Sequence, residues 1–240
     1  YTPSDYGLAP EVTYPELNQF LNETYHGEAR KLSLESIYRL SGLQKGMLFY
    51  GLYDSGSDTY MRQFGCDLEN VDVEKFKKSW NYLLQRHTTL RTAFYHDVFS
   101  IPIQVVYKHV KLPINILDFR HLNQVEQKLA IDDFIIQDKA QGFDFKMAPT
   151  MRLTLLQLDD KCYRMQWSWH HILFDGWSIP IIMEELLGTY ELLVTGKPID
   201  DLSDDRYEDY IHYIDRVDKI AEENYWRDYL KNLEQSTFLP

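Results

Sequence analysis

The 240-residue chain has few cysteines, an excess of acidic over basic residues, and no long hydrophobic run. Its two cysteines, Cys66 and Cys162, are too few and too widely spaced for a disulfide framework or a zinc site. No segment approaches the roughly 18 consecutive apolar residues of a membrane-spanning helix. The first residues also lack the basic and apolar regions of a signal peptide. We therefore expect a cytoplasmic protein without a membrane partner.

The charge balance is acidic, with 37 Asp and Glu against 25 Lys and Arg and a formal net charge of −12. Because phosphate binding requires clustered Lys and Arg, nucleic acid is not expected as the main partner. A hydrophobic content of 44 % is typical of a folded globular protein and excludes an intrinsically disordered one.

The spacing of apolar residues predicts helices interleaved with strands, which indicates a mixed α/β layer architecture. Residues 1–31 are turn-rich or polar, apart from a short helical pattern that begins at Pro15. We expect them to form a leader or interdomain linker, and we expect the compact part to span residues 32–240. The predicted helices span residues 41–53, 73–86, 122–141, 179–194 and 207–233, and the predicted strands 60–68, 90–95, 103–107, 112–117, 151–158 and 162–170.

The segment from Trp167 to Ser178 is the best candidate for chemistry. Two adjacent histidines, His170 and His171, end a predicted strand, a turn follows, and a helix begins with Ser178 as its expected N-cap. Side chains alternate along a strand, so the two imidazoles should point in opposite directions, which disfavours a shared metal ion. An imidazole can exchange a proton near neutral pH. The spacing alone leaves a purely structural role for both histidines open.

Three motifs in order resemble one family. His170-His171-x-x-x-Asp175-Gly176 resembles the HHxxxDG signature of the condensation domains of non-ribosomal peptide synthetases. Residues 41–50, SGLQKGMLFY, resemble the first motif of that family, and residues 86–94, RHTTLRTAF, resemble its RHxxLRTxF motif. The resemblance covers about residues 32–240.

The fold implied by this resemblance is an α/β (α+β) two-layer sandwich like chloramphenicol acetyltransferase. A complete condensation domain has two such lobes in a pseudo-dimer, with the active site in a tunnel between them. The later motifs of the family are absent here, so we expect the N-terminal lobe of a longer protein.

The activity implied by the resemblance is amide formation. The α-amine of an acceptor on one peptidyl carrier protein attacks the thioester of a donor on another. Both substrates hang on phosphopantetheine arms, and no metal or intrinsic cofactor is implied. By motif match, His171 is the catalytic histidine, and the backbone amide of Gly176 is a candidate oxyanion donor.

The neighbours of these two residues have expected supporting roles. His170 should make internal hydrogen bonds. Asp175 should fix the turn through an ion pair with Arg91, or alternatively with Arg86 or an arginine of the missing lobe. Trp177 should be either a core residue or part of the tunnel wall that binds substrate.

The partners implied are the donor and acceptor carriers, the C-terminal lobe, and neighbouring adenylation and epimerization domains. The leader resembles the tail of an upstream epimerization domain, and the GMLF and LFDGWS sequences resemble domains that take a D-configured donor. Three functions remain open: an amide-forming lobe that is inactive when isolated, a carrier-binding platform without chemistry, and another acyltransferase of the same fold. The complete set of motifs favours the first over the third.

Overall fold

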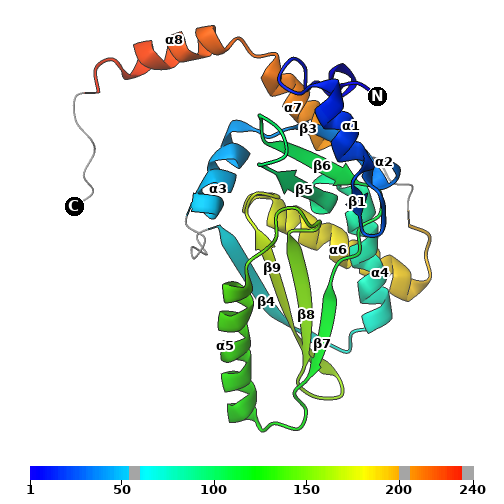
Figure 1. Cartoon of the computed structure of the whole chain (residues 1–240). Coiled ribbons are helices and arrows are strands. Elements are labelled where there is room, and N and C mark those ends of the chain that lie inside the picture. Colours follow the sequence, from blue (N-terminus) through cyan, green and yellow to red (C-terminus); the bar gives the residue numbers. More distant parts are fainter. Residues whose placement is uncertain (54–59, 200–205, 234–240) are drawn as a thin grey trace.

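A four-stranded sheet forms the centre of the structure, which is a computed structural model that describes residues 1–53, 60–199 and 206–233 (Figure 1). The strand order is β4 (Met61–Glu69), β9 (Cys162–His170), β8 (Met151–Gln157) and β7 (Ile114–Asp118). β8 and β9 are antiparallel neighbours joined by a short turn, whereas β7 runs parallel to β8.

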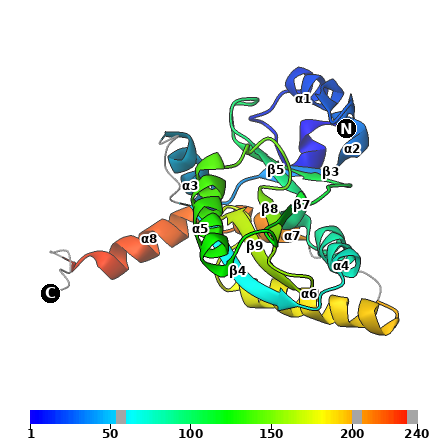
Figure 2. The ribbon, with the colours of Figure 1, turned by 90° about the horizontal axis from the view of Figure 1, so that it is seen from below.

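Helices cover both faces of this sheet (Figure 2). α5 (Gln124–Gln141) lies along one face, and α4 (Val73–Arg86) and α6 (Ser178–Thr195) lie on the other. Alternation along β9 directs Trp167 and Trp169 into the hydrophobic core, where the Trp167 ring lies 5.1 Å from that of Trp80 on α4. No helix in the described parts of the chain is long and apolar enough to cross a membrane.

A smaller sheet lies beside the first and has the order β3 (Leu34–Arg39), β6 (Ile103–Tyr107) and β5 (Thr92–Tyr95). α3 (Gly42–Tyr53) follows β3, and the short 3₁₀ helix η2 (Thr88–Arg91) precedes β5. α7 (Tyr207–Asp215) packs on this sheet through Ile211, which is buried against Tyr38 and Val106. α8 (Lys219–Leu230) projects away from the body in Figure 1 and buries none of its residues.

The mixed architecture of the prediction is confirmed, and residues 73–86, 103–107 and 162–170 form elements with the predicted bounds. The prediction of one helix over residues 207–233 is wrong, because α7 and α8 are separate. Asp218 explains the break. Its carboxylate accepts hydrogen bonds from the backbone amides of Ile220 and Ala221, each at 3.0 Å, and so begins a new helix.

Residues 1–31, expected to be a leader, pack against the body of the protein. They include the 3₁₀ helix η1 (Pro3–Tyr6), α1 (Tyr14–Asn22) and the hairpin of β1 (Thr24–Tyr25) and β2 (Glu28–Ala29), and α2 (Arg30–Ser33) begins within them. Leu8 and Leu17 have no exposed surface and belong to the same core cluster as the sheet residues. Burying these side chains stabilises the attachment by roughly 2 kcal/mol each.

One buried arginine ties this N-terminal segment to β6. The Arg30 side chain donates hydrogen bonds to the Phe20 carbonyl oxygen at 2.6 Å and to the Tyr107 hydroxyl at 3.2 Å. Its guanidinium carbon lies 3.8 Å from the centroid of the Phe20 ring. Tyr25 stacks on Tyr107 with ring centroids 3.8 Å apart. Burial raises the pKa of Tyr25 to about 12 and also raises the pKa of Tyr107, so both tyrosines are neutral at physiological pH.

We predict that Arg30→Ala lowers the free energy of unfolding by about 2–3 kcal/mol, because it leaves the buried Phe20 carbonyl without its donor and removes the cation–π contact. Urea unfolding followed by circular dichroism measures this change. Lys31→Ala is the matched control, since Lys31 is exposed and its side chain bonds to the exposed Asn22, and it should change stability by less than about 0.5 kcal/mol. Equal effects of the two variants would show that Arg30 does not anchor the segment.

Candidate active site

The turn between β9 and α6 carries most of the sequence-predicted site residues. β9 ends at His170 and α6 begins at Ser178, so residues 171–177 connect a buried strand to a helix. The backbone amide of His171 donates to the carbonyl oxygen of Tyr60 at 2.8 Å, next to the start of β4. The turn is thereby fixed to the edge of the sheet.

The ring of His171 is oriented by a hydrogen bond within the turn. Nδ1 lies 2.8 Å from the carbonyl oxygen of Phe174, and a carbonyl oxygen only accepts, so Nδ1 carries the proton. In the neutral ring Nε2 is then unprotonated and available as an acceptor. The ring is half-buried and lines two hollows, one of about 350 Å³ and one of about 290 Å³. His171 can therefore receive a proton or a hydrogen bond from a molecule in either hollow.

His170 lies on the opposite side of the strand and is 8 % exposed. Its ring packs against Phe145, with centroids 4.8 Å apart, and its Nδ1 accepts a hydrogen bond from the amide of Ile172 at 3.1 Å. Burial, together with the neighbouring His171 and Arg62, lowers the pKa of His170 to about 4. His170 is thus a neutral structural group, and the two rings lie in separate environments.

The predicted ion pair between Asp175 and Arg91 is wrong. Asp175 instead lies two residues before Trp177, the N-cap of α6, and its Oδ1 accepts hydrogen bonds from the amides of Trp177 and Ser178, each at 3.1 Å, and from the Ser178 hydroxyl at 3.0 Å. Ser178 is therefore the first helical residue and not the cap that the sequence predicted. A carboxylate in this position also interacts favourably with the positive end of the helix dipole.

Both candidate arginines of the RHTTLRTAF motif have other partners. Arg91 is 3 % exposed, and its Nη1 lies 2.5 Å from Glu35 and donates to the Tyr107 carbonyl oxygen at 2.9 Å. Arg86 lies 3.3 Å from Glu185 on α6, and the neighbouring His87 contacts the same carboxylate at 2.5 Å. This motif braces α4, α6 and the small sheet, and its charged groups do not reach the turn.

Gly176 and Trp177 lie on the surface of the turn. Trp177 is 86 % exposed, which excludes the core position that the sequence left open. A Cβ added to Gly176 would meet no atom within 4 Å, and its backbone conformation does not require glycine. Among the described residues the Gly176 amide has no hydrogen-bond partner, in contrast to the next two amides.

Aromatic rings support the turn from below. The ring of Phe174 stacks on Trp169 with centroids 5.5 Å apart and lies 5.6 Å from Trp167, which in turn contacts Trp80. This packing holds in place the Phe174 carbonyl that orients His171. The sequence analysis missed this role, although three apolar residues between the histidines and Asp175 are a signal that the turn is anchored in a core.

Gln44 of the first motif is a second anchor that the sequence analysis missed. It is 5 % exposed, and its Nε2 donates to the carbonyl oxygen of Ile172 at 3.3 Å. It also exchanges amide hydrogen bonds with Gln104 and accepts from the backbone amide of Ser41 at 3.0 Å. A glutamine between Leu43 and Met47 in a mostly apolar helical pattern was the signal available for this contact.

The three motifs, distant along the chain, meet at the larger hollow beside His171. The first motif contributes Ser41, Leu43, Gln44 and Met47, the second contributes Thr89, and the third contributes residues 171–175. Such a concave site, with several polar side chains around an available imidazole, suits proton transfer or the positioning of a polar substrate.

Comparison with known proteins agrees with the three motifs. A family model described as "Condensation domain" matches residues 34–240. The chain is 38 % identical over 237 residues to one of the linear gramicidin synthase proteins of Brevibacillus parabrevis, covering 99 % of this chain but 3 % of that protein. It is 35 % identical over 240 residues to bacitracin synthase 3 of Bacillus licheniformis, covering 100 % of this chain and 4 % of that protein. The chain therefore spans only a small part of the length of these relatives.

Solved structures share the fold over about half of their length. The starter condensation domain of rhizomide synthetase RzmA matches with a TM-score of 0.72 and 17 % identity, covering 84 % of this chain and 49 % of that chain. The EpoB cyclization-docking bidomain from Sorangium cellulosum matches with a TM-score of 0.71 and 20 % identity, covering 87 % and 43 %. These matches confirm the predicted fold class.

We predict that stability falls between pH 6.5 and pH 4 because of His170. Its pKa is about 4 in the folded protein and 6.5 in the unfolded chain, so within this window the unfolded chain binds the additional proton. The contribution of neutral His170 to the free energy of unfolding is fully present above pH 6.5. About 3 kcal/mol of it is lost as the pH falls to 4. Urea unfolding at several pH values between 4 and 6.5 measures the slope of the free energy of unfolding against pH. His170→Asn, which keeps an acceptor for the Ile172 amide, should flatten it, whereas His121→Asn at an exposed position should not.

We further predict that Gln44→Ala lowers the free energy of unfolding by about 1–3 kcal/mol, because the Ile172 carbonyl, the Ser41 amide and Gln104 lose a buried partner. Native-state hydrogen exchange should show faster exchange of the Ile172 and Leu173 amides. Gln127→Ala is a control, since Gln127 also bonds to backbone carbonyls but at α5, away from the turn. Unchanged exchange at Ile172 in Gln44→Ala would contradict the anchoring role.

Proposed function

Because the chain belongs to the condensation-domain family of non-ribosomal peptide synthetases, we propose that it is the N-terminal lobe of a peptide-bond-forming condensation domain. The reaction joins a donor thioester on one carrier protein to the α-amine of an acceptor on another. The observation that carries this proposal is the convergence of all three motifs on the hollow beside the available Nε2 of His171.

His171 is the catalytic residue of this proposal. A free α-amine has a pKa of about 7.7–8.0, so a useful fraction is already neutral near pH 7, and a strong base is not needed. With its Nδ1 proton held by Phe174, His171 offers Nε2 to the amine. It can orient the amine toward the thioester carbonyl, or accept its proton after attack. The new C–N bond forms, the C–S bond breaks, and the donor arm leaves as a thiol after receiving a proton.

Gly176 is proposed as a donor to the developing oxyanion. Its amide lies just before α6, where the dipole favours negative charge, and Asp175 already occupies the next two amides. No atom of this lobe lies within 4 Å of the position that a Cβ would take at residue 176. Contacts within the lobe therefore do not explain why this residue is a glycine. We infer that a phosphopantetheine arm passes close to this backbone. The thioester supplies the activated acyl group, so the reaction uses no cofactor held by the domain.

A second lobe is proposed to complete the site. Large apolar side chains are exposed on α3 and α8, and Trp177 is exposed beside the site. On α3, Leu43 is 72 % exposed and Phe49 is 61 % exposed. On α8, Tyr225 is 60 % exposed and Trp226 is 50 % exposed. Apolar surface of this extent is typical of an interaction face. The match over a little less than half of the length of two solved chains, a starter condensation domain and a cyclization-docking bidomain, supports this assignment. We therefore expect the isolated lobe to be inactive.

The remaining partners follow from the multidomain relatives. We propose donor and acceptor carriers on the two sides of the site, and neighbouring adenylation and epimerization domains. A D-configured donor is supported by the GMLF sequence at residues 46–49 and by LFDGWS at residues 173–178.

We predict that this chain alone forms no dipeptide, whereas the protein with both lobes does, and that His171→Ala in the latter lowers turnover by about 10²-fold or more. Intact-protein mass spectrometry of carriers loaded with D- or L-donors measures the product. A faster rate with the D-donor is expected. His121→Ala, at an exposed position, is the control and should keep full activity.

The outcomes separate the candidate functions. Product from this chain alone would show that one lobe holds the whole site. Carrier binding without product in the protein with both lobes would indicate a binding platform, and transfer to a soluble alcohol or amine would indicate another acyltransferase. Full turnover in His171→Ala would remove this histidine from the mechanism.

A further inference from the structure

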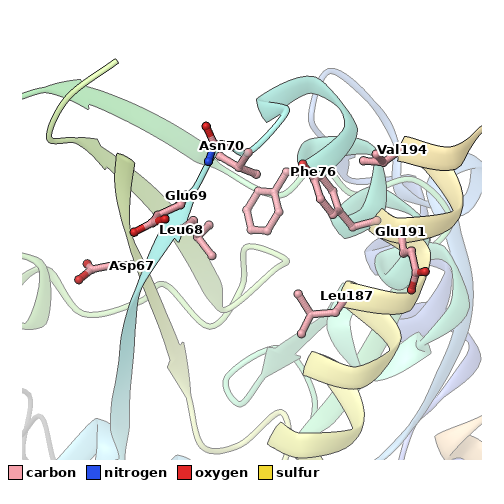
Figure 3. Close-up of a pocket in the computed structure, with 10 residues that line it drawn as sticks. Asp67, Leu68, Glu69, Asn70, Phe76, Leu187, Glu191 and Val194 are labelled. Carbon is pink, nitrogen blue, oxygen red and sulfur yellow. The ribbon is translucent and has the colours of Figure 1, made fainter. Parts of the chain in front are cut away.

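A second concave surface lies at the end of the large sheet away from His171. It is formed where β4 ends, between the first turn of α4 and the second half of α6 (Figure 3). Along β4, Met61 pairs with His170 but Glu69 pairs with Cys162, eight residues further on. At about 3.3 Å per residue, this places the groove roughly 26 Å from the proposed catalytic turn. None of the three motifs that line the catalytic hollow contributes to it.

The floor of this groove is apolar and open to solvent. Phe76 and Leu68 lie at its base, and Leu187 and Val194 of α6 form one wall, with a cavity volume of about 470 Å³. Leu187 is 53 % exposed and Val194 is 47 % exposed, although both border a hydrophobic floor. These two residues are seven positions apart and therefore lie on the same face of the helix.

Two carboxylates stand on opposite rims of the apolar floor. Figure 3 shows Glu69 on β4 and Glu191 on α6 on the two sides of Phe76. Neither forms an ion pair with any residue that the structure describes, whereas Asp67 on the same strand pairs with Arg164 at 3.2 Å. A ligand with an apolar body and positive charge on both sides is the complement of this arrangement.

The segments of this chain outside the described structure do not match that requirement. Residues 54–59, 200–205 and 234–240 contain no Lys or Arg, and the second of them contains four aspartates. Like charges would oppose their binding at the acidic rim. These three segments are therefore not the occupant that the groove favours.

We propose that this groove binds a cationic amphipathic helix of a partner polypeptide. Leucine-like side chains of the helix pack on Phe76, Leu187 and Val194, and Lys or Arg residues on its flanks pair with Glu69 and Glu191. This assignment is independent of the amide-forming reaction proposed above.

The test uses this chain and a synthetic 16-residue amidated peptide, with leucines at helical spacings of three and four on one face and lysines on the other. We expect a micromolar dissociation constant by fluorescence polarisation, weakening as salt is added. The double variant Glu69→Gln with Glu191→Gln should weaken binding about tenfold. Leu187→Ala should weaken it about fivefold without changing the melting temperature, because the side chain is half exposed in the free protein.

A matched control separates a docking site from general attraction to an acidic protein. Asp132→Asn with Asp133→Asn makes the same change in net charge on exposed positions of α5, which covers the other face of the sheet. It should leave the dissociation constant within about twofold, because the distant charges are screened. A photoreactive residue in the peptide should cross-link to residues 67–76 and 187–194.

The proposal is overturned if the control weakens binding as much as the groove variant does, if the cross-links map elsewhere, or if the peptide fails to bind at low salt. A peptide with glutamates in place of the lysines should not bind. Equal binding of that peptide would show that the carboxylates of the rim play no part.

Discussion

The hydrogen bond from Nδ1 of His171 to the Phe174 carbonyl oxygen is the interaction on which the site depends. It fixes the ring and leaves Nε2 as an acceptor. The carbonyl is itself held because the Phe174 ring packs on Trp167 and Trp169, which are fully or almost fully buried. The turn of the proposed active site therefore takes its geometry from the hydrophobic core. A change in that core would move the imidazole even if every residue of the motif were kept.

The polar residues around this turn act mainly as anchors. Gln44 holds the Ile172 carbonyl, His170 accepts from the Ile172 amide, and Asp175 begins α6. Gln44 and His170 are costly to remove, because a buried donor or acceptor without a partner loses its solvation and gains nothing in return, whereas Asp175 is exposed. The two histidines illustrate the division of roles. His170 is kept neutral by burial, whereas His171 borders two hollows.

The surfaces outside the turn divide into two kinds. α3 and Trp177 expose large apolar groups beside the motifs, and α8 exposes others where it projects from the body; these are the surfaces proposed above to meet a second lobe. The groove between β4 and α6 lies at the other end of the sheet and has carboxylates on both rims. The N-terminal segment, by contrast, is already partnered, since Arg30 and its neighbours are buried against β6. These differences in burial and charge distinguish attached segments from free docking faces.

Local periodicity and motifs were enough to predict the alternation of helices and strands, the bounds of α4, β6 and β9, and the family. Strand alternation also placed the two imidazoles on opposite sides. The partner of Asp175 could not be predicted in this way, since Arg91 and Arg86 are equally plausible on charge alone, and packing directs them to Glu35 and Glu185. Nor could local patterns show that residues 1–31 join the core or that Gln44 reaches Ile172. Such contacts join residues far apart in the chain, and their distance and burial are set by the way the whole chain folds.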